Sequence, residues 1–204
     1  QLEMMQFQSG GDEEAELQSR NIKMIYDSGN HLLELVNEVL DLSRIESGIM
    51  SFSKEAIDVV SLLSEVYSQT VPLGAGNSVS VELEIPRDIE KVFVYADRTR
   101  LKQVVLNLVS NGIKYNREKG ETVTSLLITS DGRVRMSVKD QGRGIAANQI
   151  HKLFKPFERL GAEGTEVEGT GIGLSIAKQL TEDMGGVLGY QTVENEGSLF
   201  YVEF

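Results

Sequence analysis

Two glycine-rich stretches, residues 140–145 (DQGRGI) and 168–174 (EGTGIGL), have the composition of loops that hold a phosphate compound. Glycine allows positive φ, and it lets backbone N–H groups approach a ligand with no side chain in the way. The second stretch runs into the apolar-periodic segment 172–180, so its N–H groups open a helix. Because such a helix start binds anions, we expect a phosphate site there.

The spacing of these glycines excludes two familiar phosphate loops. Gly169, Gly171 and Gly173 come late in the chain, after a polar loop, and do not follow the first strand of a βαβ unit. No Gly-Lys-Ser/Thr follows them, so a Walker-type loop is also excluded. The pattern predicts a phosphate compound held in another way.

Residues 100–115 predict an amphipathic helix with polar side chains beside its apolar face. Asn107, Asn111 and Lys114 align at i, i+4 and i+7. A carboxamide oxygen suits Mg²⁺ that already carries phosphate oxygens and waters, and an ammonium group suits the phosphates. Taken alone, this helix is more simply explained as a surface helix with polar flanks. Its apolar face comprises Leu101, Val104, Val105, Leu108 and Gly112.

Together these segments resemble the ATP-binding domain of sensor histidine kinases, a branch of the GHKL ATPase superfamily in two-component signalling. Five motifs follow the family order and spacing: the N box (107–115), first glycine box (140–144), F box (154–159), second glycine box (169–173) and closing strand (197–200). The resemblance covers roughly residues 20–204.

The resemblance implies that ATP and Mg²⁺ bind here. Asp140 would accept a hydrogen bond from the adenine amino group and disfavour guanine, whose carbonyl would face the carboxylate. Tyr115 would pack against the base, although a tyrosine at the end of an amphipathic helix is core about as often. Asn111 would ligate Mg²⁺. Asn107 and Lys114, the expected catalytic residues, would contact phosphates or the water shell of the metal.

The resemblance also makes residues 158–168 the ATP lid, anchored by Phe154 and Phe157. Without it, these two phenylalanines would simply be core residues. Arg159 would reach the γ-phosphate, with an exposed, solvated arginine as an equal alternative. The further expected cofactor-binding residues are Gly142, Gly144, Ile145, Phe157, Arg159, Gly169, Thr170, Gly171, Ile172, Gly173 and Leu174.

Length and composition fit one domain of about 150 residues with a helical appendage. The absence of cysteine excludes disulfides, thiolate zinc sites and thiol catalysis, and fits a reducing compartment. A net charge of −11 disfavours nucleic acid as a partner. No apolar run approaches the length that spans a bilayer, so we expect a cytoplasmic segment without membrane contact, whose parent could be anchored by other regions.

The appendage, residues 1–50, carries ten acidic and three basic residues, which fits a solvated helical surface. We expect the tail of a first helix over 1–8, a turn at 9–11, and a second helix from the N-cap Asp12 to Gly48. A heptad stripe predicts a coiled-coil or bundle seam: Ile22, Ile25, Gly29, Leu33, Val36, Leu40 and Ser43. Residues 41–48 resemble the end of the dimerisation and phosphotransfer hairpin of the family, which implies a homodimer and a response-regulator receiver as partners.

Residues 51–204 are predicted to form the catalytic domain. Strand patterns occur at 51–57, 78–85, 92–95, 122–129, 134–139, 186–192 and 198–204, with a hairpin turn at Asp131 and Gly132. Helices are expected over 58–71, with Asp58 as N-cap, and over 98–115 and 172–184. They would cover one face of a mixed sheet in the Bergerat-type α/β sandwich of the superfamily.

The histidines depart from the family pattern. A histidine kinase carries its phosphoacceptor in a His-Glu-x-x-Thr-Pro-like context, and neither His31 nor His151 has it. We expect His31 to face solvent, His151 to pack on a helix surface, and the acceptor to lie on a first helix before Gln1. The leading hypothesis is the catalytic part of a sensor histidine kinase. The alternatives are an acceptor-less regulatory pseudo-kinase and a GHKL ATPase, the latter disfavoured because water-cleaving relatives carry a glutamate at the position of Asn107.

Overall fold

The computed structural model describes residues 2–48, 50–160 and 169–204, with the backbone alone for 2–16, 27, 30, 31, 34 and 46. The chain divides into two compact units, Gln1–Asp41 and Leu42–Phe204, which we describe separately. The second unit begins before the predicted boundary at residue 51, because the last turn of the first helix packs with it and Ile45 is buried there.

The first helix, α1 (Leu2–Glu46), runs without interruption. The predicted turn at residues 9–11 and the helix start at Asp12 are therefore wrong. Glycine permits a turn without enforcing one, and eight residues before it form only about two helical turns, too few to bury much of a seam. The predicted stop is confirmed, because Gly48 has φ +65° and its N–H donates to the carbonyl oxygen of Ile45 at 2.9 Å.

A five-stranded mixed sheet forms the centre of the second unit, in the order β2-β4-β5-β7-β6. β2 and β4 are parallel, and every other neighbouring pair is antiparallel. The strands are β2 (Ser80–Glu84), β4 (Glu121–Ile128), β5 (Val134–Asp140), β6 (Val187–Val193) and β7 (Gly197–Glu203). A separate antiparallel pair joins β1 (Lys54–Asp58) to β3 (Phe93–Asp97).

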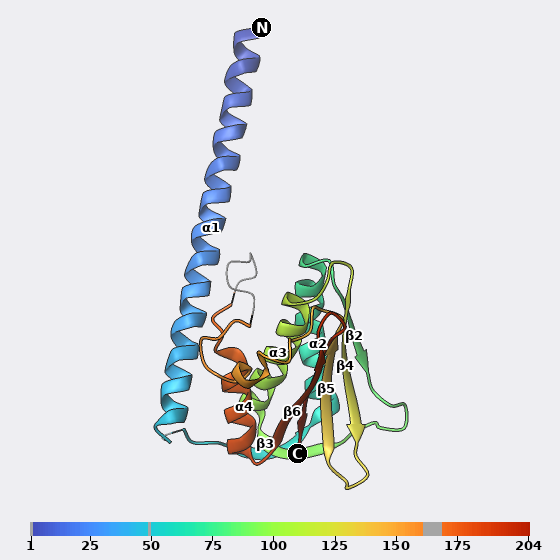
Figure 1. Ribbon diagram of the computed structural model, residues 1–204. Helices are drawn as coiled ribbons and strands as arrows, with labels where there is room; N and C mark the ends of the chain where they lie inside the picture. The colour runs from blue at the N-terminus through green and yellow to red at the C-terminus, as the bar shows by residue number, and fades with distance from the viewer. Residues whose placement is uncertain (1, 49, 161–168) are drawn as a thin grey trace. The chain divides into compact units, whose positions relative to one another are not determined.

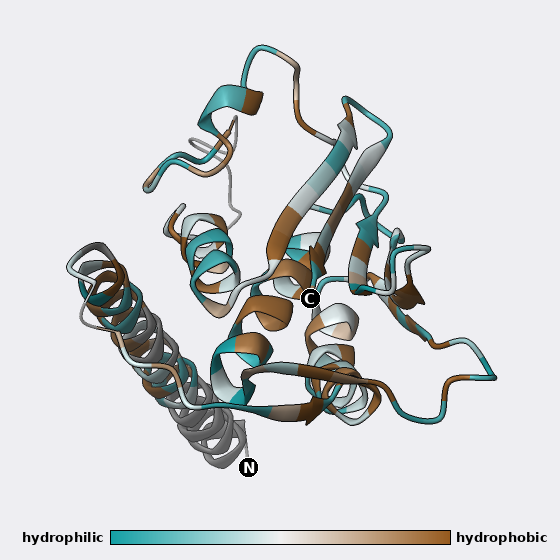
Figure 2. Ribbon diagram, turned by 90° about the horizontal axis from the view of Figure 1, so that it is seen from below, coloured by the Kyte–Doolittle hydropathy of each residue, from teal (hydrophilic) through white to brown (hydrophobic). Residues whose placement is uncertain are grey.

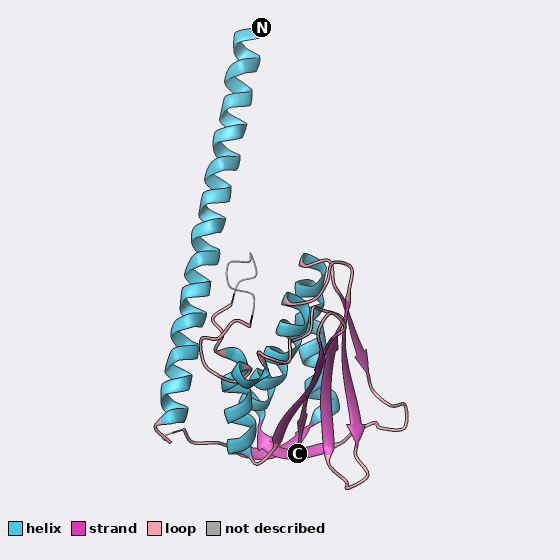
Figure 3. Ribbon diagram, in the orientation of Figure 1, coloured by secondary structure: helices cyan, strands magenta, loops and turns pink. Residues whose placement is uncertain are grey.

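Three helices cover one face of this sheet, and Figures 1 and 3 show the two layers. They are α2 (Val59–Gly76), α3 (Arg98–Lys114) and α4 (Gly173–Met184). Figure 2 shows hydrophobic and hydrophilic residues alternating along these helices. The fully buried side chains include Leu62, Val104, Leu108, Ile176 and Val202, which form the core between helices and sheet. The expected α/β sandwich is confirmed.

Aspartates at strand ends start two of the helices. The Asp58 side chain accepts from the backbone N–H of Val60 at 3.2 Å, as predicted, and Asp97 accepts from that of Arg100 at 3.1 Å. Such caps satisfy N–H groups that have no partner within the helix. The predicted end of α2 at residue 71 is too early, because the helix continues through Pro72 to Gly76, with Leu73 half-buried against the core and Gly74 buried.

Candidate nucleotide-binding site

The N box occupies the last two turns of α3. Its apolar face is buried as predicted, Asn107 and Asn111 are half-buried, and Lys114 is exposed. Thr122 on β4 donates its hydroxyl to the carbonyl oxygen of Gly112 at 2.9 Å and lies opposite Asp140 in the sheet register. This contact holds the end of α3 beside the end of β5, where the first glycine box begins.

Asp140 ends β5 and is only 8% exposed. Its Oδ1 accepts hydrogen bonds from the backbone N–H groups of Gly142 at 2.8 Å and Ser198 at 3.1 Å. Burial raises the pKa of Asp140 above its ordinary value, and these two hydrogen bonds offset part of the rise. Within the described residues Oδ2 accepts no hydrogen bond, so it is available to an N–H donor on a ligand. The sequence did not predict the hydrogen bond from Ser198, because its pattern indicates a strand there but not which side chain the N–H of Ser198 meets.

The first glycine box leaves no room for side chains at two positions. A Cβ at Gly142 would lie 2.2 Å from the carbonyl oxygen of Tyr115, and one at Gly144 would lie 2.0 Å from that of Val193. Gly144 also has φ +61°. The loop is thus held against the end of α3 on one side and the end of β6 on the other, with Ile145 donating its N–H to Thr192 Oγ1 at 3.0 Å.

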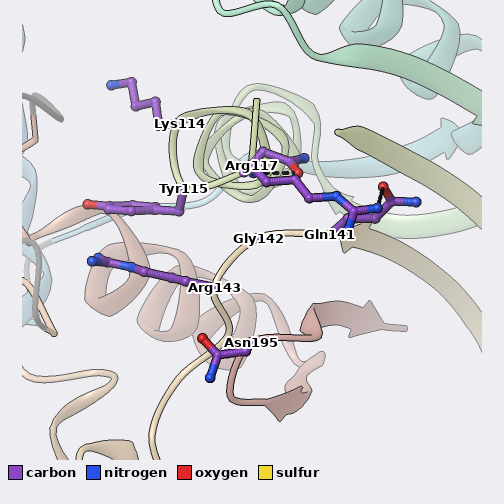
Figure 4. A pocket seen from close by; sticks show the side chains of 8 residues that line it. Lys114, Tyr115, Arg117, Gln141, Gly142, Arg143 and Asn195 are labelled. Carbon is purple, nitrogen blue, oxygen red and sulfur yellow. Dashed lines mark hydrogen bonds between the residues drawn. The ribbon is translucent and has the colours of Figure 1, made fainter. Parts of the chain in front are cut away.

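A cavity of about 330 Å³ opens beside this loop (Figure 4). It contains three of the predicted site residues, Lys114, Tyr115 and Gly142. Its other lining residues are Asn116, Arg117, Gln141, Arg143 and Asn195, none of which was predicted. The signal for Gln141 and Arg143 was present, because both lie within the glycine box, whereas Asn195 comes from the distant β6–β7 turn.

The second glycine box forms the start of α4. Ile172 is the N-cap residue, and within the described residues no side chain caps the helix, so the N–H groups that open α4 are available to a ligand. Asn107 Nδ2 donates to the carbonyl oxygen of Gly173 at 3.3 Å, which joins the N box to this glycine box. The Ile172 side chain is buried and its N–H donates to Thr170 Oγ1 at 3.0 Å, so Gly173 and Leu174 are better placed to contact an anion.

The F box separates the two predicted anchors. Phe154 packs edge-on against Tyr190, with ring centroids 5.7 Å apart, so its anchoring role is supported. Phe157 is 65% exposed, so its predicted packing in the core is wrong. Its backbone has φ +68°, and its N–H donates to the carbonyl oxygen of Gly171 while its ring remains exposed. Arg159 is half-buried, which disfavours a fully solvated arginine. Most of the expected lid, residues 161–168, lies outside the described residues.

The model of the family described as histidine kinase-, DNA gyrase B- and HSP90-like ATPase matches residues 96–204, which is 109 of the 204 residues. The chain belongs to this ATPase family. The match begins at the end of β3 and contains all five motifs, and the relatives given below identify the catalytic region of a sensor histidine kinase.

Curated relatives of this ATPase-family chain are histidine kinases and sensor proteins. It is 36% identical over 193 residues to the circadian input-output histidine kinase CikA of Synechococcus elongatus, covering 92% of the chain and 25% of CikA. It is 36% identical over 200 residues to the virulence sensor protein BvgS of Bordetella bronchiseptica, covering 94% of the chain and 16% of BvgS. The chain therefore spans a quarter or less of the length of these two relatives.

Solved structures of histidine kinases share the fold. Full-length ShkA in complex with AMPPNP matches with a TM-score of 0.74 and 30% identity, over 87% of this chain and 36% of ShkA. The nucleotide-free catalytic domain of ThkA matches with a TM-score of 0.63 and 33% identity, over 76% of this chain and 95% of that domain. ThkA in complex with the response regulator TrrA matches with a TM-score of 0.64 and 28% identity, over 85% of this chain and 48% of ThkA.

The side chains available as ligands decide how this catalytic region would hold a metal ion. The described part of the chain contains no group of three or more His, Asp or Glu side chains placed to hold a metal ion. A site with one carboxamide, Asn111, fits a Mg²⁺ ion whose other ligands are phosphate oxygens and waters.

His151 is exposed on the short 3₁₀ helix η1 (Ile150–Lys152), and the side chain of His31 lies outside the described residues. None of the described helices is long and apolar enough to cross a membrane.

Proposed function

We propose that this chain binds Mg-ATP and positions its γ-phosphoryl group for in-line attack by a histidine imidazole, in two-component signal transduction. The observation that carries the proposal is the buried carboxylate of Asp140, whose Oδ1 is held by two backbone N–H groups while Oδ2 is left for a donor. A fixed acceptor of this kind suits the amino group of adenine and disfavours the carbonyl of guanine.

The phosphates would lie between the N box and the start of α4. The Asn107–Gly173 hydrogen bond brings these two elements together, and the helix start offers N–H groups and the positive end of a dipole. Asn111 would ligate Mg²⁺ and the exposed Lys114 would reach the phosphates. Phosphoryl transfer depends on such positioning and charge stabilisation, because the protein itself does little covalent chemistry.

The second candidate is an ATPase that uses water as acceptor. The amide at Asn107 disfavours it, because a carboxamide cannot act as a general base toward water in the way a glutamate can. An acceptor-less regulatory module is the third candidate, and it would use the same nucleotide contacts. Only the transfer step distinguishes the three.

Exposed apolar residues on α1 support a second part of the proposal, the formation of a homodimer. Five apolar residues of the predicted seam are exposed in the single chain: Ile22 (67%), Ile25 (73%), Leu33 (59%), Val36 (47%) and Leu40 (48%). A continuous apolar stripe on a helix is stabilised when it packs into a coiled coil or bundle, so we propose a homodimer through residues 1–50.

A receiver domain is the proposed phosphoryl acceptor after histidine, as the ThkA–TrrA complex suggests by analogy. The cytoplasm, which supplies ATP and Mg²⁺, is the proposed location.

The transfer test uses the whole 204-residue chain and γ-labelled Mg-ATP, with and without a helical hairpin carrying a His-Glu-x-x-Thr-Pro-like helix supplied in trans. We expect an acid-labile, base-stable label on the histidine of the hairpin, and none on the chain alone. Label on His31 or His151 would make one of them the acceptor instead. Release of free phosphate without any labelled protein would favour the ATPase, and binding without either reaction would favour the regulatory module.

A further inference from the structure

Arg143, the residue between the two closely packed glycines of the first glycine box, lies against the ring of Tyr115. Its guanidinium carbon is 5.4 Å from the ring centroid, within the distance of about 6 Å at which a cation is attracted to a π face. Figure 4 shows the two side chains extending in the same direction, one from the end of α3 and one from the loop, with Gly142 beside them. A planar cation therefore covers the face of Tyr115 that is turned toward the loop.

The backbone of Arg143 is held by its neighbours, whereas its side chain is exposed. Its carbonyl oxygen accepts from the N–H of Asn195 at 2.7 Å, and the glycines on both sides are in contact with neighbouring backbone. The side chain itself is exposed. These backbone contacts place the base of the Arg143 side chain beside Tyr115, so the position of the guanidinium group depends on the side-chain rotamer.

The spacing has a direct consequence for a ligand. A flat aromatic base between a phenol ring and a guanidinium group needs about 3.5 Å on each side, or about 7 Å in all. The guanidinium carbon now lies 5.4 Å from the ring centroid, so the guanidinium group would have to retreat by at least about 1.6 Å to admit a base. A long arginine side chain can make that shift on a fixed backbone. Asp140 ends β5, and its Oδ1 accepts from the N–H of Gly142, which lines the cavity. In the proposed complex, Oδ2 would bond the edge of the base.

We propose that Arg143 closes over the adenine base on the face opposite Tyr115, so that the base is held between a phenol ring and a guanidinium group. This inference rests on the proposed nucleotide site and adds a base-contacting residue to it. Since the contact is made with the base, it contributes equally to the binding of ATP, ADP and adenosine.

The cavity supplies a matched control. Arg117 is a second exposed cation in its lining, but its guanidinium donates to Gln141 Oε1 at 2.8 Å. Figure 4 shows that the Arg117–Gln141 pair extends away from the Tyr115–Arg143 pair. Removing Arg117 therefore changes the charge of the cavity by the same amount without removing the stacked group.

The test measures binding of ATP, ADP and adenosine by calorimetry to the whole chain and to its Arg143→Ala, Arg143→Lys and Arg117→Ala variants. We expect Arg143→Ala to weaken all three ligands by one common factor of about 3 to 30. Arg143→Lys should weaken binding less than Arg143→Ala, because lysine keeps the positive charge but lacks the planar guanidinium group. Arg117→Ala removes the same charge from the cavity but not the stacked group, so it should weaken the three ligands by a clearly smaller factor than Arg143→Ala. The unliganded melting temperatures of the Arg143 variants should not change.

Two results would overturn this inference. A loss that grows from adenosine to ADP to ATP would assign Arg143 to the phosphates, and an Arg143→Ala variant that binds all three ligands normally would leave it no role. Failure of the unchanged chain to bind ATP would overturn the proposed function itself. Coupling in a double-mutant cycle with Tyr115→Ala provides a separate check, since residues that hold one ring from two sides give non-additive losses.

Discussion

The backbone N–H of Phe157 donates to the carbonyl oxygen of Gly171 at 3.0 Å, which joins the F box to the second glycine box. The approach is close, because a Cβ at Gly171 would lie 2.9 Å from the carbonyl carbon of Phe157 and Gly171 has φ +74°. Gly171 is followed directly by the N-cap of α4. This junction thus sets where the N–H groups that would face the phosphates begin.

Gly171→Ala should destabilise the junction by about 1–3 kcal/mol, because alanine is strained at positive φ and its Cβ meets backbone atoms. We expect a lower melting temperature and weaker ATP binding, measured by calorimetry on the same samples. Gly76→Ala is the matched control, since its Cβ would enter open space. Normal ATP affinity in Gly171→Ala would show that the junction does not position the nucleotide.

Asp140→Asn should weaken ATP binding by about 1.5–3 kcal/mol, because an amide loses charge assistance and must orient its oxygen correctly. Discrimination against GTP should fall at the same time, since the amide N–H₂ can donate to the guanine carbonyl. Titration calorimetry with both nucleotides measures the two effects. An unchanged ATP affinity would remove Asp140 from the site.

Asp140→Asn should also raise the free energy of unfolding of the unliganded protein at neutral pH. Burial raises the pKa of Asp140, so its ionisation opposes folding, and the stability of the parent falls as the pH rises from the unfolded value through the raised folded pKa. The advantage of the variant should therefore shrink as the pH is lowered toward that of the unfolded group. Denaturant unfolding at several pH values measures it.

Asp131 provides a control for that experiment, because its pKa is shifted in the opposite direction from that of Asp140. A hydrogen bond from the Thr129 hydroxyl lowers the pKa of Asp131, so its ionised form favours folding. Asp131→Asn should therefore not be more stable than the parent at neutral pH. An Asp140→Asn variant less stable than the parent would mean that the two N–H bonds to the carboxylate outweigh its burial.

Asn111→Ala should abolish most of the Mg²⁺ dependence of ATP binding with little loss of fold stability, because alanine is a good helix former and the carboxamide ligand is gone. ATP titrations with Mg²⁺ and with a chelator measure the dependence. Ser110→Ala is the neighbouring control, since the Ser110 hydroxyl donates to the carbonyl oxygen of Asn107 within the same helix. Full Mg²⁺ dependence in Asn111→Ala would place the metal ligand elsewhere.

Leu33→Glu should weaken self-association through the apolar stripe of α1, because it would bury a charge in the seam. Sedimentation velocity over a range of concentrations should show a shift toward the monomer. Leu32→Glu introduces the same charge at an exposed leucine outside the predicted seam and should have a smaller effect. Equal effects of the two substitutions would contradict the seam.

Residue order alone determined most of the elements and the positions of the glycine boxes. Alternating apolar residues predict the strands, Asp58 predicts a helix start, and Gly48 predicts a helix stop, because each acts through the backbone of its near neighbours. The turn predicted at residues 9–11 failed for the same reason. Local glycines allow a turn, but the surrounding helix decides whether one forms.

Tertiary structure alone decided which atoms meet. Ser198 holds Asp140 across 58 residues, and Asn107 holds Gly173 across 66, so both contacts depend on how the strands and helices pack. The stacking of Arg143 on Tyr115 has the same origin, since the motifs named the glycines on either side but not the ring that the arginine would meet. Local sequence carries backbone preference, whereas contacts between distant residues depend on the complete sheet and its layer of helices.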